Sequence, residues 1–169
     1  MPQGNDEDLA LSRRAAAGDA AAFAMLVEKH EARLRAFLSR MAGRDAADDL
    51  AQEAFLKAWR RAGQYDGRSR YSTWLTRIAW RCRLDQLRKE RPTPEMPEAI
   101  RTTASPVEID DMLARLKESE RAALILCEGH GWTHAEAAGL LALPLGTLKS
   151  TVARAKAKCR ALWVGEADA

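Results

Sequence analysis

The sequence has few of the residues that build sheets, and it lacks a long apolar run. Valine and isoleucine together supply only eight of its 169 residues, whereas alanine supplies 33 and leucine 20. Because β-branched residues favour strands and alanine and leucine lose least on entering a helix, this imbalance predicts an all-helical protein. No apolar run approaches the roughly 18 residues of a membrane span, and the polar, acidic N-terminus is unlike a signal peptide. We therefore expect a cytoplasmic protein without direct membrane insertion.

Cysteine and histidine are equally scarce, with three of each. Cys82, Cys127 and Cys159 are odd in number and far apart, which is typical of reduced core thiols, with redox sensing as the alternative. His130 and His134 flank a glycine turn without a third ligand, which disfavours zinc. The chain also lacks a phosphate-binding glycine loop, a nucleophile elbow and a recognisable cysteine–histidine pair. We expect no metal, no cofactor, no small-molecule substrate and no enzymatic activity.

A proline-rich stretch divides the chain. Four of the six prolines lie in residues 91–106, where each removes a backbone donor and disfavours helix in the residue before it. Such a stretch is extended and cannot bury a core. We predict a domain over residues 1–90, a linker over 91–106 and a second domain over 107–169.

Hydrophobic periodicity and capping residues predict eight helices. Their expected ranges are Glu7–Ala17, Ala20–Met41, one opening at Asp45, one from Ser72 or Thr73 to Lys89, Val107–Lys117, Ser119–Glu128, Thr133–Leu141 and Pro144–Val164. The inward-facing positions are expected at Phe23, Leu26, His30, Leu34, Phe37, Leu38, Met41, Leu50, Ala51, Ala54, Phe55, Ala58, Trp59, Leu75, Ile78, Ala79, Cys82, Leu148, Val152, Ala155 and Leu162. The fold class is all-α, with two small helical domains joined by a Pro-rich linker. A short helix, a turn ending in proline and a basic helix make the C-terminal domain a helix-turn-helix.

The net charge of +3 is unevenly distributed. Segments 66–89 and 144–160 each carry a net charge of +5, whereas residues 45–56 contain four acids and no base. Two separate basic segments of helical composition suggest a polyanion that is contacted twice. The alternative is that these are ordinary solvated faces.

Four stretches carry a resemblance to a known family. In chain order they are Asp45–Arg60, Tyr71–Lys89, Gly131–Ala138 and Leu143–Ser150. The first resembles the acidic helix of the bacterial RNA polymerase sigma factors of the sigma-70 family, in the extracytoplasmic-function (ECF) class. The second is similar to the promoter-melting helix of that family, and the last two resemble its helix-turn-helix.

The resemblance implies a subunit that binds core RNA polymerase and directs promoter-specific transcription initiation. It assigns core-polymerase docking to Asp48, Asp49, Gln52, Glu53 and Phe55. It assigns contacts with the minus-10 element, read as a melted strand, to Tyr65, Arg68, Arg70, Tyr71, Arg77, Trp80, Arg81 and Arg88. It assigns contacts with the minus-35 element, read as a duplex, to Thr147, Lys149, Ser150, Thr151, Arg154, Lys156 and Lys158. The expected partners are core RNA polymerase, promoter DNA and an anti-sigma factor.

Several of these residues have a purely structural alternative. Acids in the first turns of a helix complement its dipole, which accounts for Asp48 and Asp49 but poorly for Glu53. Trp80 is either a stacking surface or a packing residue, and we expect Trp74 to pack.

Four further positions bear on how the family's roles carry over. Asp85 matches a family position, and we expect it to orient an arginine rather than to touch DNA. Thr151 stands where the family usually has an arginine, and Arg81 where it often has an asparagine. The base preference at these two positions is therefore open. Ala137 replaces the usual isoleucine of the third motif, which affects only packing.

Two other functions deserve comparison. A stand-alone helix-turn-helix regulator would explain the C-terminal domain equally well, but not the acidic helix or the Trp/Arg-rich helix before the linker. A purely protein-binding helical adaptor would leave both basic segments without a partner.

Overall fold

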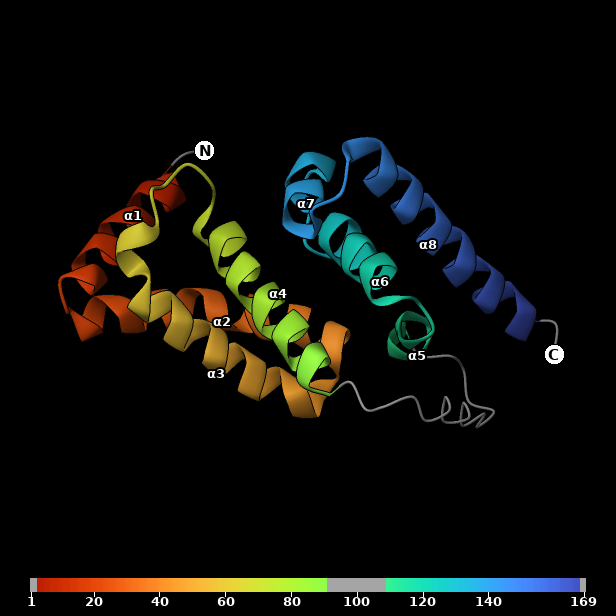
Figure 1. The fold of residues 1–169 in the computed structure, drawn as a ribbon, viewed down its shortest axis with the longest axis horizontal. Helices are drawn as coiled ribbons and strands as arrows, with labels where there is room; N and C mark the ends of the chain where they lie inside the picture. Colours follow the sequence, from red (N-terminus) through yellow and green to blue (C-terminus); the bar gives the residue numbers. More distant parts are fainter. Residues whose placement is uncertain (1–2, 91–108, 168–169) are drawn as a thin grey trace. The chain divides into compact units, whose positions relative to one another are not determined.

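The computed structural model describes residues 3–90 and 109–167 (Figure 1). The chain divides into two compact units, Met1–Lys89 and Glu90–Ala169. All regular structure in the described residues is helical, which confirms the all-α fold class. The predicted linker 91–106 lies outside the described residues, so its bounds stay a prediction.

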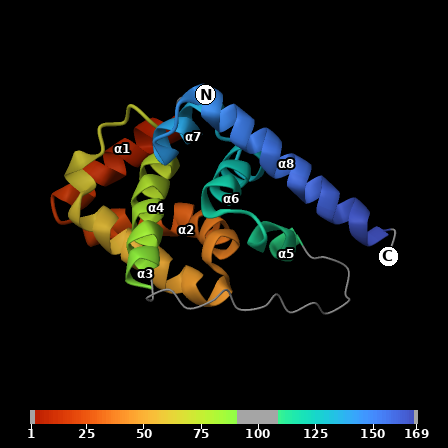
Figure 2. The same cartoon turned by 45° about the vertical axis from the view of Figure 1, so that its right-hand side comes forward.

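The N-terminal unit consists of four helices and one short 3-10 turn (Figures 1 and 2). They are α1 (Gln3–Ala16), α2 (Ala20–Ala42), α3 (Arg44–Arg60), the 3-10 turn η1 (Ala62–Gln64) and α4 (Tyr71–Lys89). Asp19 caps α2, since its Oδ1 accepts a hydrogen bond from the Ala22 amide at 3.0 Å. Gly43 then ends α2 at φ +82°, a conformation that glycine adopts without steric cost.

The core of this unit lies where α2, α3 and α4 pack together. Its buried side chains include Leu26, Leu34, Phe37, Leu38, Met41, Leu50, Ala54, Ala58, Leu75, Ala79 and Cys82. The predicted inward stripes are thus confirmed at these positions. Phe23, His30 and Trp59 are only partly buried. Tyr71, predicted to precede the fourth helix, is instead its first residue and is fully buried.

Within residues 109–167, the C-terminal unit also consists of four helices, one of them extended by a π-helical turn. They are α5 (Ile109–Ala114), α6 (Glu118–Leu124), the π-helical turn η2 (Ile125–Gly129), α7 (His134–Leu141) and α8 (Leu145–Ala167). The helix predicted over Ser119–Glu128 therefore changes its hydrogen-bonding pattern after Leu124. The helix predicted over Val107–Lys117 is shorter than expected within the described residues.

The helix-turn-helix is formed by α7 and α8 (Figure 2). Thr133 and Glu136 cap α7 reciprocally, with the Thr133 amide donating to Glu136 Oε2 at 2.9 Å and the Glu136 amide to Thr133 Oγ1 at 3.2 Å. Ala142 ends α7 in the left-handed conformation at φ +52°. The predicted inward residues Leu148, Val152 and Ala155 of α8 are buried, which fixes the face that α8 turns outward.

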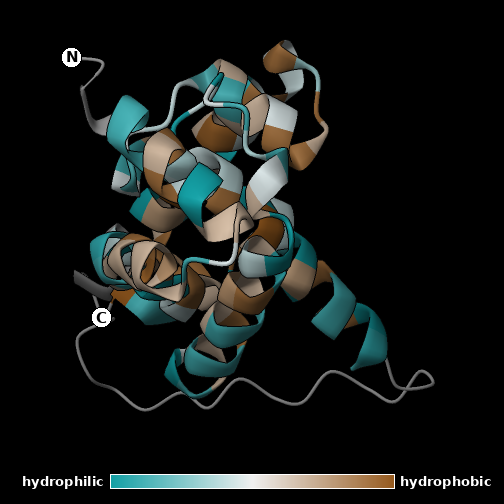
Figure 3. Cartoon of the chain, turned by 90° about the vertical axis from the view of Figure 1, so that its left-hand side faces the viewer, coloured by the Kyte–Doolittle hydropathy of each residue, from teal (hydrophilic) through white to brown (hydrophobic). Residues whose placement is uncertain are grey.

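Hydrophobic and hydrophilic residues occur along the same helices (Figure 3), as expected of amphipathic elements that cover a small core. Among the helices in the described residues, none combines the length and the apolar character needed to span a bilayer.

Two leucines of α8 provide a test of this packing. Leu148 is fully buried, whereas Leu145 is 45% exposed. Leu148→Ala leaves a cavity and is expected to lower the free energy of unfolding of the C-terminal unit by about 2–5 kcal/mol. Leu145→Ala, the matched control, is expected to cost less than about 1 kcal/mol. Amide hydrogen exchange on the full chain measures the unit separately, and equal losses in both variants would contradict the assignment of the buried face.

Candidate functional site

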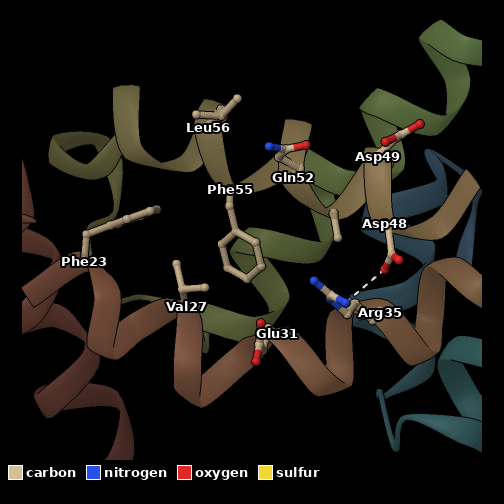
Figure 4. Close-up of a pocket in the computed structure, with 10 residues that line it drawn as sticks. Phe23, Val27, Glu31, Arg35, Asp48, Asp49, Gln52, Phe55 and Leu56 are labelled. Atoms are coloured by element: carbon tan, nitrogen blue, oxygen red, sulfur yellow. Dashed lines mark ion pairs between the residues drawn. The ribbon is translucent and has the colours of Figure 1, made fainter.

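The acidic edge of α3, which consists of Asp48, Asp49 and Glu53, lies beside a groove between α2 and α3 (Figure 4). The groove has a volume of about 430 Å³. Its apolar lining comes from Phe23 and Val27 of α2 and from Phe55 and Leu56 of α3. Its polar lining consists of Glu31, Arg35, Asp48, Asp49 and Gln52. Four of the five predicted docking residues therefore line one groove, whereas Glu53 faces α4, and Asp49 borders both sides.

Two of the three predicted docking acids are already paired. Asp48 lies 3.0 Å from Arg35, across the groove from α3 to α2 (Figure 4). Glu53 lies 2.7 Å from Lys57 on the next turn of α3, and this contact raises the pKa of the Lys57 ammonium. Asp49 is exposed and forms no ion pair with any described residue. Its carboxylate is the uncompensated charge of the acidic edge.

Phe55 differs from the other predicted docking residues because only 8% of it is exposed. It points from α3 toward α2 (Figure 4), and its ring meets Phe23 edge-on at a centroid distance of 6.4 Å. Phe55 therefore forms the floor of the groove. The exposed apolar surface beside it comes from Leu56, of which 52% is exposed.

The α2 side of the groove is a part that the sequence interpretation missed. Phe23, Val27, Glu31 and Arg35 recur every four residues, so they lie along one face of α2. This face is adjacent to the buried stripe. The sequence signal that could have identified this side of the groove is the second four-residue repeat on α2, next to the repeat of buried residues.

The aromatic residues predicted to stack on a melted base are buried, which corrects that expectation. Tyr65 is 4% exposed, Tyr71 1% and Trp80 7%. The Tyr65 and Tyr71 rings lie 5.1 Å apart, and Trp74 packs on both at 5.5 and 5.3 Å. Burial raises the pKa of the Tyr65 hydroxyl to about 12 and also raises that of Tyr71. Tyr65, Tyr71 and Trp80 therefore belong to the buried core, whereas Trp74 is only partly buried.

The arginines of the loop and of α4 that were predicted to contact DNA are exposed, by contrast. Arg77, Arg81 and Arg88 are separated by four and seven residues, which puts them on one face of α4. Arg68 and Arg70 are exposed on the loop before the helix, and the Arg68 side chain is 90% accessible. Asp85 lies 3.7 Å from Arg88, in agreement with the expectation that it orients an arginine.

The start of α8 presents the other predicted DNA-binding residues. Thr147, Lys149, Ser150 and Arg154 are exposed there. Thr151 is only 4% exposed, and its hydroxyl donates to the Thr147 carbonyl oxygen at 2.8 Å while accepting from Arg154 at 3.3 Å. Thr151 therefore holds neighbouring residues instead of facing outward, which corrects its predicted role.

Lys156 and Lys158 are exposed on α8, and both pair with acids of their own unit. Lys156 lies 2.7 Å from Glu128. Lys158 donates to both carboxylate oxygens of Glu120, at 2.9 and 2.8 Å, and this lowers the pKa of that buried carboxyl. Lys158 ties α8 to α6, and no local pattern revealed this because the two residues are 38 positions apart.

Comparison with known proteins agrees with this architecture. The family model for sigma-70 region 2 matches residues 26–93, and that for sigma-70 region 4 matches residues 107–159. The ECF RNA polymerase sigma factor SigM of Mycobacterium tuberculosis is 35% identical over 152 residues, which cover 84% of this chain and 77% of that protein. The RNA polymerase sigma-H factor of Pseudomonas aeruginosa is 32% identical, covering 89% of this chain and 91% of that protein.

Two solved structures are similar in fold. The sigma factor RpoE of Bartonella quintana, crystallised with the anti-sigma factor NepR, is 25% identical with a TM-score of 0.69, covering 83% of this chain and 95% of that one. CnrH, solved with the cytosolic domain of CnrY, is 24% identical with a TM-score of 0.71, covering 94% of this chain and 98% of that one. Together with the two matched regions and the curated relatives, these findings show that the chain belongs to the ECF class of the sigma-70 family of RNA polymerase sigma factors.

Proposed function

We propose that this chain binds core RNA polymerase and directs it to promoters by reading the minus-10 element as a melted strand and the minus-35 element as a duplex. The observation that carries the proposal is that regions 2 and 4 both match in one chain, in order. A stand-alone regulator needs only the second. The protein contributes recognition and positioning, while the polymerase performs the chemistry.

Docking on the polymerase is proposed to use the acidic edge of α3. Asp49 and Gln52 are exposed at the rim of the groove, and Asp49 carries its uncompensated charge. An exposed acid beside apolar Leu56 suits a basic, amphipathic partner helix. Asp48 and Glu53 would join the contact by exchanging their internal partners, and Phe55 would contribute through the groove floor.

Contact with the melted minus-10 strand is proposed for the five exposed arginines of the loop and α4. They are Arg68, Arg70, Arg77, Arg81 and Arg88. Guanidinium groups pair with phosphates and also stack on unpaired bases, and a line of them can follow a single strand. The buried aromatic residues are proposed to hold the loop from beneath.

Contact with the minus-35 duplex is proposed for Thr147, Lys149, Ser150 and Arg154. The first turns of the second helix of a helix-turn-helix enter the major groove, and these four side chains are exposed in those turns. Arg154 is the natural candidate for a bidentate contact with guanine, worth about 1–3 kcal/mol of discrimination.

An anti-sigma factor is proposed as the regulating partner, because the structurally similar RpoE is held in a complex with one. The groove between α2 and α3 offers an apolar floor and a charged rim that an inhibitor could cover. An inhibitor seated there would exclude the polymerase by occupying Asp49 and Gln52.

Run-off transcription on a genomic promoter library, with bacterial core polymerase, tests the proposed function. We expect discrete starts only when both the polymerase and this chain are present. Asp49→Lys should reduce these starts by roughly a hundredfold or more, because a like charge facing a basic partner costs several kcal/mol. Asp110→Lys makes the same charge change on an exposed residue of α5, outside the groove, and should leave the starts in place.

The opposite result would be equally informative. If the polymerase initiates no differently with this chain, while the chain alone binds duplex DNA, the sigma function is wrong and a stand-alone regulator replaces it.

Two lysines of α8 distinguish DNA contact from internal pairing. Lys149→Ala should weaken promoter binding by the holoenzyme and reduce its dependence on salt by about one phosphate contact, with stability unchanged. Lys158→Ala should instead destabilise the C-terminal unit by on the order of 1 kcal/mol, because Glu120 loses its charged partner. Filter binding across a salt series and hydrogen exchange measure the two effects, and a reversed pattern would contradict the structure.

A further inference from the structure

Helix α1 precedes the region 2 match, which begins at residue 26. It nevertheless contacts the segment that leads into α4. The Ser12 hydroxyl, fully buried, donates to the Ala62 carbonyl oxygen of η1 at 2.9 Å. Nearer its N-terminal end, α1 contacts the loop of residues 65–70, on which Arg68 and Arg70 are exposed. The contacts of α1 with this loop include hydrogen bonds from a polar side chain, in addition to apolar packing.

Asn5 bonds to this loop at two points. Its Nδ2 donates to the Gly67 carbonyl oxygen at 2.6 Å, and its Oδ1 lies 2.6 Å from the Tyr65 hydroxyl, which donates to it. The same hydroxyl lies 2.8 Å from the Ser69 carbonyl oxygen, so its hydrogen is shared between the two acceptors. Asn5 therefore bonds directly to Gly67 and Tyr65, and the Tyr65 hydroxyl extends the connection to Ser69. Three positions of the loop are linked to α1 in this way.

The backbone at Gly67 shows how closely the loop approaches α1. Gly67 has φ +75°, and a Cβ placed there would lie 2.9 Å from Leu9 Cδ2 of α1. Glycine satisfies both constraints, the conformation and the short approach. On the outer side, Asp66 Oδ1 accepts a hydrogen bond from the Arg68 amide at 3.0 Å, which closes a turn that directs the arginines outward.

We infer that Asn5 is a positioning residue, which fixes the loop in the shape that reads a base of the melted minus-10 strand. This inference rests on the proposed function. A loop that samples several shapes can accept several bases, whereas a loop held in one shape in advance presents one set of contacts and so discriminates between bases. The two hydrogen bonds of Asn5 hold the backbone that carries Arg68 and Arg70, and so act on base discrimination through those residues. Asn5 itself touches no DNA.

The test uses holoenzyme assembled from bacterial core polymerase and the full chain. It is mixed with a pool of short single-stranded DNA oligonucleotides of random sequence, and the bound strands are sequenced. The readout is the ratio of the preferred base to the others at each enriched position. Asn5→Ala is expected to lower this ratio about fivefold at the position that the loop reads, as the loss of one net hydrogen bond implies. Tyr65→Phe, which keeps the ring and removes the hydroxyl, should lower it similarly.

Ser12→Ala is the matched control. It also removes a hydrogen bond from an α1 side chain to a backbone carbonyl, but at η1 instead of the loop. It should lower the thermal midpoint at least as much as Asn5→Ala does, and should leave the base ratios unchanged. The comparison separates positioning from general stability.

The outcomes distinguish this inference from the proposed function. If wild-type holoenzyme enriches a sequence and Asn5→Ala gives the same ratios, the positioning role of Asn5 is overturned while strand reading stands. If Ser12→Ala lowers the ratio as much as Asn5→Ala, the effect is one of stability and the inference is also wrong. If wild-type holoenzyme enriches no sequence, reading of a melted strand fails, and this inference fails with it.

Discussion

Alanine side chains let α3 pack closely between α2 and α4, and the arrangement of the N-terminal unit depends on this packing. Ala47, Ala51, Ala54 and Ala58 are almost completely buried because α2 covers one side of α3 and α4 covers another. Larger side chains at these positions would force the helices apart. With so much of its circumference in contact, α3 has only a narrow edge for charged residues. The acidic edge is therefore a consequence of packing as much as of composition.

The same principle determines where the charged residues of α4 lie. In α4 the buried Ile78, Ala79 and Cys82 fix the face that points inward, and the arginines occupy what is left. Because helical positions four and seven residues apart share a face, those arginines form a line. A single strand is a line of phosphates, so the geometry of the proposed binding surface follows from which side of α4 the core requires.

Periodic features could be predicted from the sequence, whereas pairings between distant residues could not. The inward stripes and the helix-turn-helix depend on neighbours a few residues away, and the structure confirms the helix-turn-helix and most positions of the stripes. The hydrogen bond of the Tyr65 hydroxyl needs Asn5, a partner 60 positions away, and the ion pair of Lys158 needs Glu120, 38 positions away. A tyrosine or lysine in a basic segment looks the same whether it faces DNA or its own core. The two cases differ only in the distant residue that the side chain contacts in the folded protein.

The ion pairs at the acidic edge affect what a partner must supply. A partner that binds Asp48 competes with Arg35, and one that binds Glu53 competes with Lys57, so either contact exchanges one ion pair for another. Exposed pairs of this kind contribute about 0–1 kcal/mol, so the exchange is close to neutral in free energy. The exchange does require that the partner place a cation directly beside the acid, because the displaced Arg35 and Lys57 would repel a partner cation in any other position. At the proposed docking surface, the compensated acids would thus contribute to selectivity, and attraction would fall mainly to Asp49 and to the apolar groove beside it.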